Sequence, residues 1–287
     1  MTDWNDRRRR FRAVIEGDVC VHPGSVFDPM SARIAQDIGF EVGMLAGSTG
    51  SLTVLGAPDL IVLTLTEFAA QALRINRAAE LPLMVDADHG YGNALSVMRT
   101  VQELETAGVS GMSIEDTELP QPYGEAKQRL LTLEEGVGKM KAAAAAKQDE
   151  KLVIAGRTSA VAVAGLEEGV KRAKAYEACG VDALFMVGVK TRAEVDAISE
   201  ATTLPLILGG ATPELEDKDY LGARRVRIAL QGHQPIMAGI EAIRATLQAL
   251  RDGVKPRDLT GLPTAETVQT ATRSDAYAQW TKDFLGG

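Results

Sequence analysis

The segment LPLMVDADHGYG, residues 81–92, combines an apolar run with two acids and a glycine-rich turn. Side chains alternate between the two faces of a strand, so Asp86 and Asp88 lie on one face where an apolar strand ends. Like charges held this close repel unless a cation or a proton lies between them. A hard divalent ion with oxygen ligands, Mg²⁺ or Mn²⁺, accounts for the pair. The alternative is a solvated loop that uses aspartate for turn formation.

Eight apolar runs of this kind alternate with helical patterns over most of the chain. They span residues 19–27, 41–46, 83–88, 111–115, 152–157, 183–187, 206–209 and 225–230. Strands that are buried on both faces and separated by helices predict a parallel sheet. Eight strand–helix units in about 250 residues are typical of a (β/α)₈ TIM-type barrel, the predicted fold. A doubly wound sheet is the alternative, because periodicity cannot show that a sheet closes.

The helical segments between these runs have recognisable faces and ends. The clearest faces consist of Leu95, Met98, Val101 and Leu104, and of Ile236, Ile240, Ile243, Leu247 and Leu250. Glycines close three helices just before the next strand, as a left-handed residue after a helix would, at Gly39, Gly108 and Gly180. We expect one barrel domain over residues 1–254. Residues 255–287 form an extension whose aromatic residues pack on the barrel or on a neighbouring subunit.

Composition excludes several classes of function. The chain has 31 Lys and Arg against 39 Asp and Glu, a net charge of −8, which argues against a nucleic-acid surface. The basic run Arg7–Arg10 is interpreted as the solvated face of an N-terminal helix. We find no apolar run of membrane-spanning length and no signal peptide, so we expect a cytoplasmic protein without a membrane partner. Cys20 and Cys179 lie among apolar residues and are expected to be reduced thiols.

Chemically active residues collect at the predicted strand ends, where barrel enzymes carry their sites. The ends carry Ser48, the pair Asp86 and Asp88, Glu115 with Asp116, Arg157, the pair Gly209 and Gly210, and His233. Each has a purely structural alternative: Ser48 and Glu115 can cap helices, Arg157 can pair at the surface, and His233 can be a structural histidine. Asp59 lies in a loop where turn formation is the default interpretation. Together they predict an anion-binding pocket ringed by carboxylates. With three histidines in the chain, a His-rich zinc site is not expected.

With these residues assembled, the chain resembles the phosphoenolpyruvate mutase/isocitrate lyase superfamily from Ser25 to about Val254. The matching pieces are SVFDPMSAR at 25–33, DADHGYG at 86–92, Ile114-Glu115-Asp116 and Arg157-Thr158. It looks most like the bacterial oxaloacetate decarboxylase branch, through DADHGYGNA at 86–94 and Gly232-His233.

This resemblance implies a barrel whose C-terminal helix is swapped between subunits of a homotetramer, a dimer of dimers. It also implies Mg²⁺ bound by Asp86, with Asp59, Asp88 and Glu115 holding it through water. Ser48, Arg157 and His233 are the implied contacts to substrate.

Three departures from the family pattern bear on the reaction. Lyases of this superfamily carry a Cys and a His in the loop after Glu-Asp, whereas residues 117–125 read TELPQPYGE. The usual Arg-Thr-Asp is here Arg157-Thr158-Ser159. The segment Gly209-Gly210-Ala211 is smaller and less polar than in the close decarboxylases, which leaves the exact substrate open.

The resulting hypothesis is Mg²⁺-dependent decarboxylation of oxaloacetate, a small dicarboxylate, to pyruvate and CO₂ through a metal-stabilised enolate. Arg157 holds the C1 carboxylate, backbone N–H groups near Ser48 donate to the oxyanion, and His233 orients the substrate. The loop over residues 117–129 acts as a lid. One alternative is a C–C lyase or hydrolase of a related 2-oxo or 2-hydroxy dicarboxylate. Another is a non-catalytic protein that binds such a dicarboxylate.

Overall fold

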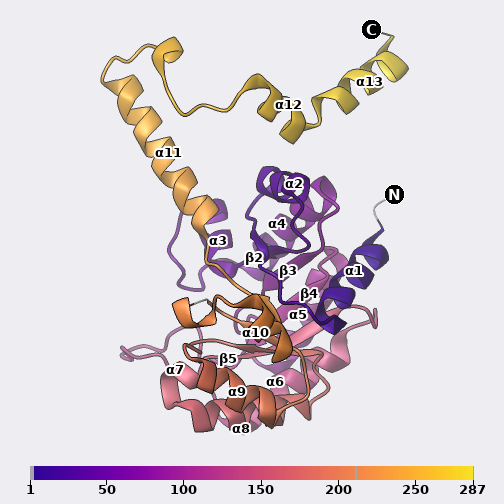
Figure 1. Cartoon of the computed structure of the whole chain (residues 1–287), viewed down its shortest axis with the longest axis vertical. Coiled ribbons are helices and arrows are strands. Elements are labelled where there is room, and N and C mark those ends of the chain that lie inside the picture. The colour runs from indigo at the N-terminus through magenta and orange to yellow at the C-terminus, as the bar shows by residue number, and fades with distance from the viewer. Residues whose placement is uncertain (1–2, 211, 287) are drawn as a thin grey trace. The chain divides into compact units, whose positions relative to one another are not determined.

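The computed structural model describes residues 3–210 and 212–286. Eight parallel strands form one sheet in sequence order. They are β1 (Gly24–Ser25), β2 (Gly43–Leu45), β3 (Leu83–Asp86), β4 (Gly111–Glu115), β5 (Val153–Thr158), β6 (Ala183–Met186), β7 (Leu206–Leu208) and β8 (Val226–Ala229). Helices follow the strands in sequence and lie outside the sheet (Figure 1).

The first and last strands meet, which closes the sheet into a barrel. Val21 forms a parallel bridge with Ile228, its N–H donates to the carbonyl of Arg227 at 2.9 Å, and its carbonyl accepts from Ala229 N–H at 3.0 Å. The predicted (β/α)₈ barrel is confirmed and the doubly wound alternative is wrong. The first strand is shorter than the predicted 19–27, because its pairing changes from β8 at Val21 to β2 at Gly24 and Pro23 between them has no N–H.

The barrel is covered by helices that follow the predicted pattern. They are α2 (Pro29–Ile38), α3 (Gly47–Gly50) with the π-helical η1 (Ser51–Leu55), α4 (Leu65–Ala78), α5 (Ala94–Thr106), α6 (Leu133–Ala146), α7 (Ala160–Ala164), α8 (Leu166–Glu177), α9 (Arg192–Ala201), the 3₁₀ turn η2 (Pro213–Leu215) and α10 (Lys218–Ala223). Gly39, Gly108 and Gly180 have φ of 98°, 83° and 83°, the left-handed backbone predicted for them. One predicted helix face is wrong at Leu95, which is 74% exposed, whereas α5 buries Val101 and Leu104 as predicted, together with Val97.

One end of the barrel is closed by α1 (Trp4–Glu16), whose Phe11 and Ile15 are fully buried within the interior apolar cluster. Phe11 lies so close to Gly111 at the start of β4 that any side chain there would collide with its ring. The interpretation of Arg7–Arg10 as a solvated face is wrong for Arg7 and Arg8. Both are buried, because Arg7 donates to the carbonyl of Asn76 and Arg8 pairs with Asp149 at 2.9 Å.

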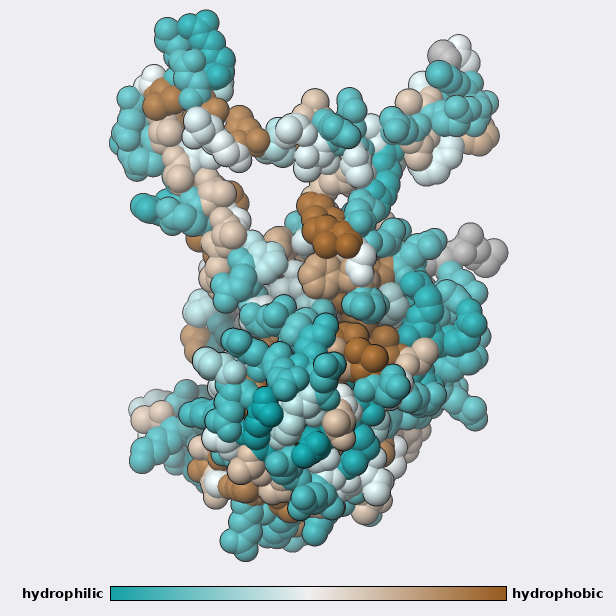
Figure 2. All heavy atoms as spheres, in the orientation of Figure 1, coloured by the Kyte–Doolittle hydropathy of each residue, from teal (hydrophilic) through white to brown (hydrophobic). Residues whose placement is uncertain are grey.

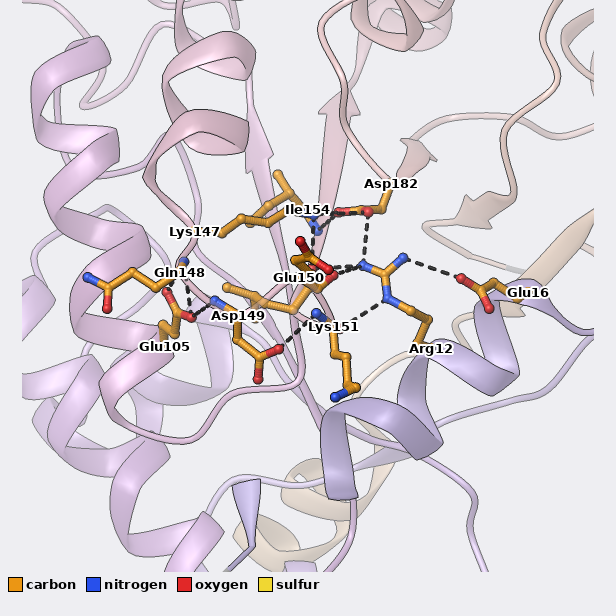
Figure 3. A network of polar contacts seen from close by, with 11 residues as sticks. Arg12, Glu16, Glu105, Lys147, Gln148, Asp149, Glu150, Lys151, Ile154 and Asp182 are labelled. Atoms are coloured by element: carbon orange, nitrogen blue, oxygen red, sulfur yellow. Dashed lines mark hydrogen bonds and ion pairs between the residues drawn. The ribbon is translucent and has the colours of Figure 1, made fainter. Parts of the chain in front are cut away.

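Arg12 of α1 fastens the same end of the barrel (Figure 3). Its Nη2 donates to the carbonyls of Glu150 at 2.7 Å and Leu152 at 3.0 Å, and pairs with Asp182 at 2.9 Å. Asp182, just before β6, also accepts from Ile154 N–H at 2.9 Å and pairs with Lys147 at 2.9 Å. This network joins α1 to the first residues of β5 and β6, at the end of the barrel opposite the predicted site.

The chain divides into two compact units, residues 1–232 and 233–287. The second unit consists of α11 (Gln234–Arg251), the 3₁₀ turn η3 (Pro256–Asp258), α12 (Ala265–Thr272) and α13 (Ser274–Leu285). No residue of α11 is buried, and its predicted apolar face is exposed by 62% at both Ile243 and Leu247. The predicted domain boundary after residue 254 stays a prediction. In the described residues we find no helix long and apolar enough to cross a membrane, and both cysteines are free thiols.

Candidate active site

Asp86 is the last residue of β3, and neighbouring groups fix its carboxylate. Its Oδ1 accepts from Ser113 Oγ on β4 at 3.1 Å and from the backbone N–H of Asp88 at 3.2 Å. The residue is only 9% exposed. The β3–β4 register pairs Asp86 with Ser113, so the fold itself places a donor beside this acid.

The turn after β3 has an unusual backbone. Asp88, Gly90, Tyr91 and Gly92 all have positive φ, at 48°, 74°, 58° and 148°. Two of these are not glycine, and such strain persists only where surrounding structure enforces it. The Asp88 carboxylate packs against Gly47, where a Cβ would lie 2.5 Å from Oδ2, so glycine is needed at the start of α3.

Burial is the main reason that the pKa of Asp88 lies well above its ordinary value, and the charges of Asp86, Glu115 and Asp59 add to it. Glu115, the last residue of β4, is in the same situation. Its pKa is raised by burial and by Asp86, although Arg157 and a hydrogen bond from Thr117 Oγ1 at 2.8 Å oppose the shift. The acids therefore repel one another inside the protein.

Arg157 on β5 supplies the compensating charge. Its Nη1 donates to Asp86 Oδ2, and its Nε lies 3.6 Å from Glu115 Oε2. Its Cζ lies 5.3 Å from the ring centre of Phe185. Burial opposes the charge of this guanidinium, but the surrounding carboxylates outweigh burial and raise its pKa. Arg157 Nε is buried without a hydrogen-bond acceptor, so the side chain retains an unused donor.

These side chains line a pocket of about 270 Å³. Its lining comes from the loop between η1 and α4, the ends of β3 to β5 and the loop after β4: Asp59, Leu60, Ile61, Asp86, Asp88, Glu115, Thr117, Glu118, Leu119, Gln121, Pro122, Lys127, Gln128, Arg129 and Arg157. The predicted lid, residues 117–129, thus forms one wall of the pocket.

Both ends of the lid are attached to the barrel. Asp116 Oδ2 accepts from Arg172 at 2.8 Å, Tyr176 at 2.5 Å and Thr158 at 2.9 Å. Arg172 Nη2 donates to the carbonyl of Leu131 at 2.9 Å, and Leu131 N–H donates to the carbonyl of Asp116 at 2.8 Å. The lid therefore departs from the barrel at Asp116 and returns beside it at Leu131.

The structure brings together most of the predicted site residues: Asp59, Asp86, Asp88, Glu115 and Arg157 line one pocket. Ser48 lies in α3, next to Gly47, and does not line this pocket. His233 begins the second unit as the residue before α11. Ala211 lies outside the described residues. The roles assigned to all of these residues stay predictions.

Sequence reasoning missed three residues that shape the site. Ser113 lies two positions before Glu115 on the same strand face, so its alternation was a usable signal. Phe185 contacts Arg157 only through the β5–β6 register, which periodicity cannot supply. Tyr91 has a buried hydroxyl without a hydrogen-bond partner, and its pKa is raised by burial and by Asp88.

The carboxylates suit a metal ion that also binds water and substrate. Within residues 3–210 and 212–286, no three His, Cys, Asp or Glu side chains form a group that could hold an ion unaided. Mg²⁺ commonly binds through one or two carboxylates, while water and substrate fill its other positions. Asp86, with Asp88 and Glu115 in the same pocket and their repulsion only partly compensated by Arg157, fits this mode of binding.

Comparison with known proteins places the chain in a family. A family model described as phosphoenolpyruvate phosphomutase matches residues 11–251. The chain belongs to the phosphoenolpyruvate phosphomutase family. It is 56% identical over 283 residues to a protein named oxaloacetate decarboxylase from Rhodopseudomonas palustris strain BisB18, covering 99% of this chain and 98% of that protein. A protein of the same name from Bradyrhizobium diazoefficiens is 55% identical over the same shares.

Solved members of the phosphoenolpyruvate phosphomutase family share the fold over the full length. A phosphoenolpyruvate phosphomutase from Streptomyces platensis subsp. rosaceus matches with a TM-score of 0.86 at 26% identity, over 97% of this chain and 99% of that one. Phosphonopyruvate hydrolase in complex with oxalate and Mg²⁺ matches with a TM-score of 0.85 at 28% identity, over the same shares. The resemblance inferred from the sequence is confirmed, and a solved relative binds Mg²⁺.

Because Asp88 is buried, we expect its carboxyl group to lower the stability of the metal-free protein. Since its pKa is raised, ionisation of Asp88 destabilises the folded state once the pH exceeds the ordinary value of 3.8, and more strongly as the pH rises towards the raised value. Asp88→Asn removes this charge, and asparagine tolerates the left-handed backbone. Without divalent metal, we expect the variant to melt at a higher temperature than the parent, by more at pH 8 than at pH 5.

Thermal denaturation in EDTA measures this difference. Glu200→Gln, at an exposed position on α9, is the control that removes a charge without relieving burial. A stabilisation that is equal at both pH values, or an Asp88→Asn protein that melts below the parent, would contradict the electrostatic account.

Proposed function

We propose that this protein is a Mg²⁺-dependent oxaloacetate decarboxylase that converts oxaloacetate to pyruvate and CO₂. The observation that carries the proposal is the ring of buried carboxylates around Arg157, at the strand ends where barrel enzymes hold their active sites. Relatives that are 55–56% identical over 98–99% of this chain carry the name oxaloacetate decarboxylase and support the choice of reaction.

Asp86 would hold the metal directly, and Asp59, Asp88 and Glu115 would hold it through water. When bound, Mg²⁺ supplies a Lewis acid that takes up the negative charge developing on the keto oxygen. Ser113 and Thr117 keep the Asp86 and Glu115 carboxylates in place by donating hydrogen bonds at 3.1 Å and 2.8 Å. Preorganised donors of this kind need no rearrangement during the reaction.

Arg157 would bind the C1 carboxylate of the substrate. A guanidinium binds a carboxylate through two parallel hydrogen bonds, and Arg157 already lies in the pocket with an unused Nε donor. Backbone N–H groups near Ser48 would donate to the enolate oxygen, and His233 would orient the substrate. The lid would exclude water while the carbanion character develops.

The composition of the lid favours decarboxylation over C–C cleavage or hydrolysis. The described residues that line the pocket include no cysteine and no histidine, so the general acid of the superfamily's lyases has no counterpart in this lining. Solved relatives at 26–28% identity include 2,3-dimethylmalate lyase and oxaloacetate acetylhydrolase. Cleavage of oxaloacetate to oxalate and acetate therefore remains the alternative reaction to test, and binding without turnover is the non-catalytic one.

The assembly we propose is a homotetramer in which α11 packs on a second copy. The barrel unit exposes an apolar stripe on α2, at Met30, Ile34 and Ile38, which is visible as apolar surface over that helix in Figure 2. The second unit exposes Ile243 and Leu247 on α11. Two unpartnered apolar helix faces in one chain are suited to an interface between copies.

The reaction is tested by pyruvate release from oxaloacetate with Mg²⁺, and with excess EDTA, against the metal-catalysed background. We expect fast release that EDTA abolishes. Asp86→Ala should lower kcat/KM about a thousandfold, roughly 4 kcal/mol of transition-state stabilisation, while Glu200→Ala leaves it unchanged. Oxalate and acetate as products would establish the hydrolase instead, and full activity of Asp86→Ala would refute the metal assignment.

The assembly is tested by light scattering after size exclusion. We expect the parent at four times the chain mass of 30.6 kDa. Ile243→Glu and Ile34→Glu place a charge on the two apolar faces and should each lower the mass. Ala245→Glu introduces the same charge elsewhere on α11 and should not. A monomeric parent, or unchanged mass in both interface variants, would contradict the proposal.

A further inference from the structure

Three cations line the catalytic pocket within the described residues, and they differ in how they are compensated. Arg157 pairs with Asp86 and Glu115. Arg129 pairs with Glu118 at 3.2 Å and with Glu125 at 2.9 Å. Lys127 lines the same pocket but takes part in no ion pair or hydrogen bond in the described structure. Its charge is therefore available to an anion that enters the pocket.

Contacts within the lid, residues 117–129, hold the segment that carries Lys127 in place. Thr117 and Leu130 form an antiparallel bridge, and Glu118 N–H donates to the carbonyl of Arg129 at 2.9 Å. Gln128, the neighbour of Lys127, donates to Thr117 Oγ1 at 3.4 Å, and Thr117 in turn donates to Glu115. The returning strand of the lid is thus tied to the rim of the carboxylate ring, and Lys127 lies on it at the pocket wall.

The chemistry of a C4 dicarboxylate calls for a second positive group. Its C1 carboxylate and keto oxygen are accounted for by Arg157 and the Asp86 end of the pocket, on the proposed function. Its C4 carboxylate carries a full charge that the lining acids, five against three cations, would repel. We propose that Lys127 binds the C4 carboxylate of the substrate and makes the site selective for dicarboxylates. The predicted effect on oxaloacetate turnover rests on the proposed function, whereas the predicted binding of a dicarboxylate by Lys127 does not.

The step itself decides how Lys127 affects the kinetics. When the C3–C4 bond breaks, its electron pair forms the C2=C3 double bond of the enolate, the carbonyl pair moves to the keto oxygen, and C4 leaves as neutral CO₂. The charge that Lys127 contacts therefore disappears on the way to the transition state. An interaction that weakens along the reaction stabilises the bound substrate more than the transition state, so its loss weakens binding without slowing the chemical step. Loss of Lys127 should therefore raise KM, and kcat should stay the same or rise.

Lys127→Met tests this assignment, with Lys127→Arg as the conservative variant and Lys174→Met as a control that removes an exposed lysine on α8. We expect Lys127→Met to raise KM for oxaloacetate about tenfold, as loss of one charge-assisted hydrogen bond would, with kcat equal to or above that of the parent. Lys127→Arg and Lys174→Met should stay close to the parent in both.

Two inhibitors separate the C4 subsite from the rest of the pocket without turnover. Malate keeps both carboxylates, so its dissociation constant from the Mg²⁺-loaded protein should rise about tenfold in Lys127→Met. Oxalate offers no group at the C4 position, so its dissociation constant should change less than twofold. Weaker binding of oxalate in parallel would show a general loss of lid structure and overturn the proposal.

Unchanged malate binding in Lys127→Met, or a fall in kcat at constant KM, would also overturn it. The fall in kcat would instead make Lys127 a proton donor. Absence of oxaloacetate turnover in the parent protein would refute the proposed reaction alone, because the malate and oxalate comparison would still test the subsite.

Discussion

The mutual repulsion of Asp86, Asp88 and Glu115 is the constraint on which the rest of the site depends. Three ionised carboxylates at the ends of two adjacent strands are tolerated in the folded protein only if cations and hydrogen-bond donors lie close to them. Arg157 from the next strand supplies one charge, and hydroxyl groups of Ser113 and Thr117 supply hydrogen bonds. Burial, together with the repulsion that remains uncompensated, raises the pKa of Asp88 and Glu115, and the proposed divalent ion would neutralise this repulsion.

The contacts of α1 that stabilise the barrel and the carboxylate pocket lie at opposite ends of the barrel. At one end, Phe11 fills the interior and Arg12 binds the starts of β5 and β6 through carbonyls and Asp182. At the other end, the turn after β3 keeps two non-glycine residues, Asp88 and Tyr91, at positive φ. Strain of this kind costs about 1–3 kcal/mol per residue and has to be offset elsewhere. The closed, well-packed end of the barrel is suited to offset it.

The sequence allowed the strands and the carboxylate ring to be predicted, because period-2 alternation and strand ends are local properties. Ser48, Phe185 and the basic helix α1 show where such reasoning stops. In the sequence, Arg7 and Arg8 belong to an ordinary run of basic residues. Both are nevertheless buried, because partners far along the chain compensate them: the Asn76 carbonyl accepts from Arg7, and Asp149 pairs with Arg8. The contact between Phe185 and Arg157 depends on strand register. Long-range partners of this kind leave no periodic signal.

In the proposed mechanism, Arg157 exchanges one carboxylate partner for another: Asp86 in the structure described, and the C1 carboxylate of the substrate during the reaction. A crystal structure with Mg²⁺ and oxalate tests this most directly. The account predicts the ion on Asp86, and the Arg157 guanidinium withdrawn from Asp86 and paired with oxalate. An ion bound away from Asp86, or an Arg157 still paired with Asp86 while oxalate lies elsewhere, would contradict it.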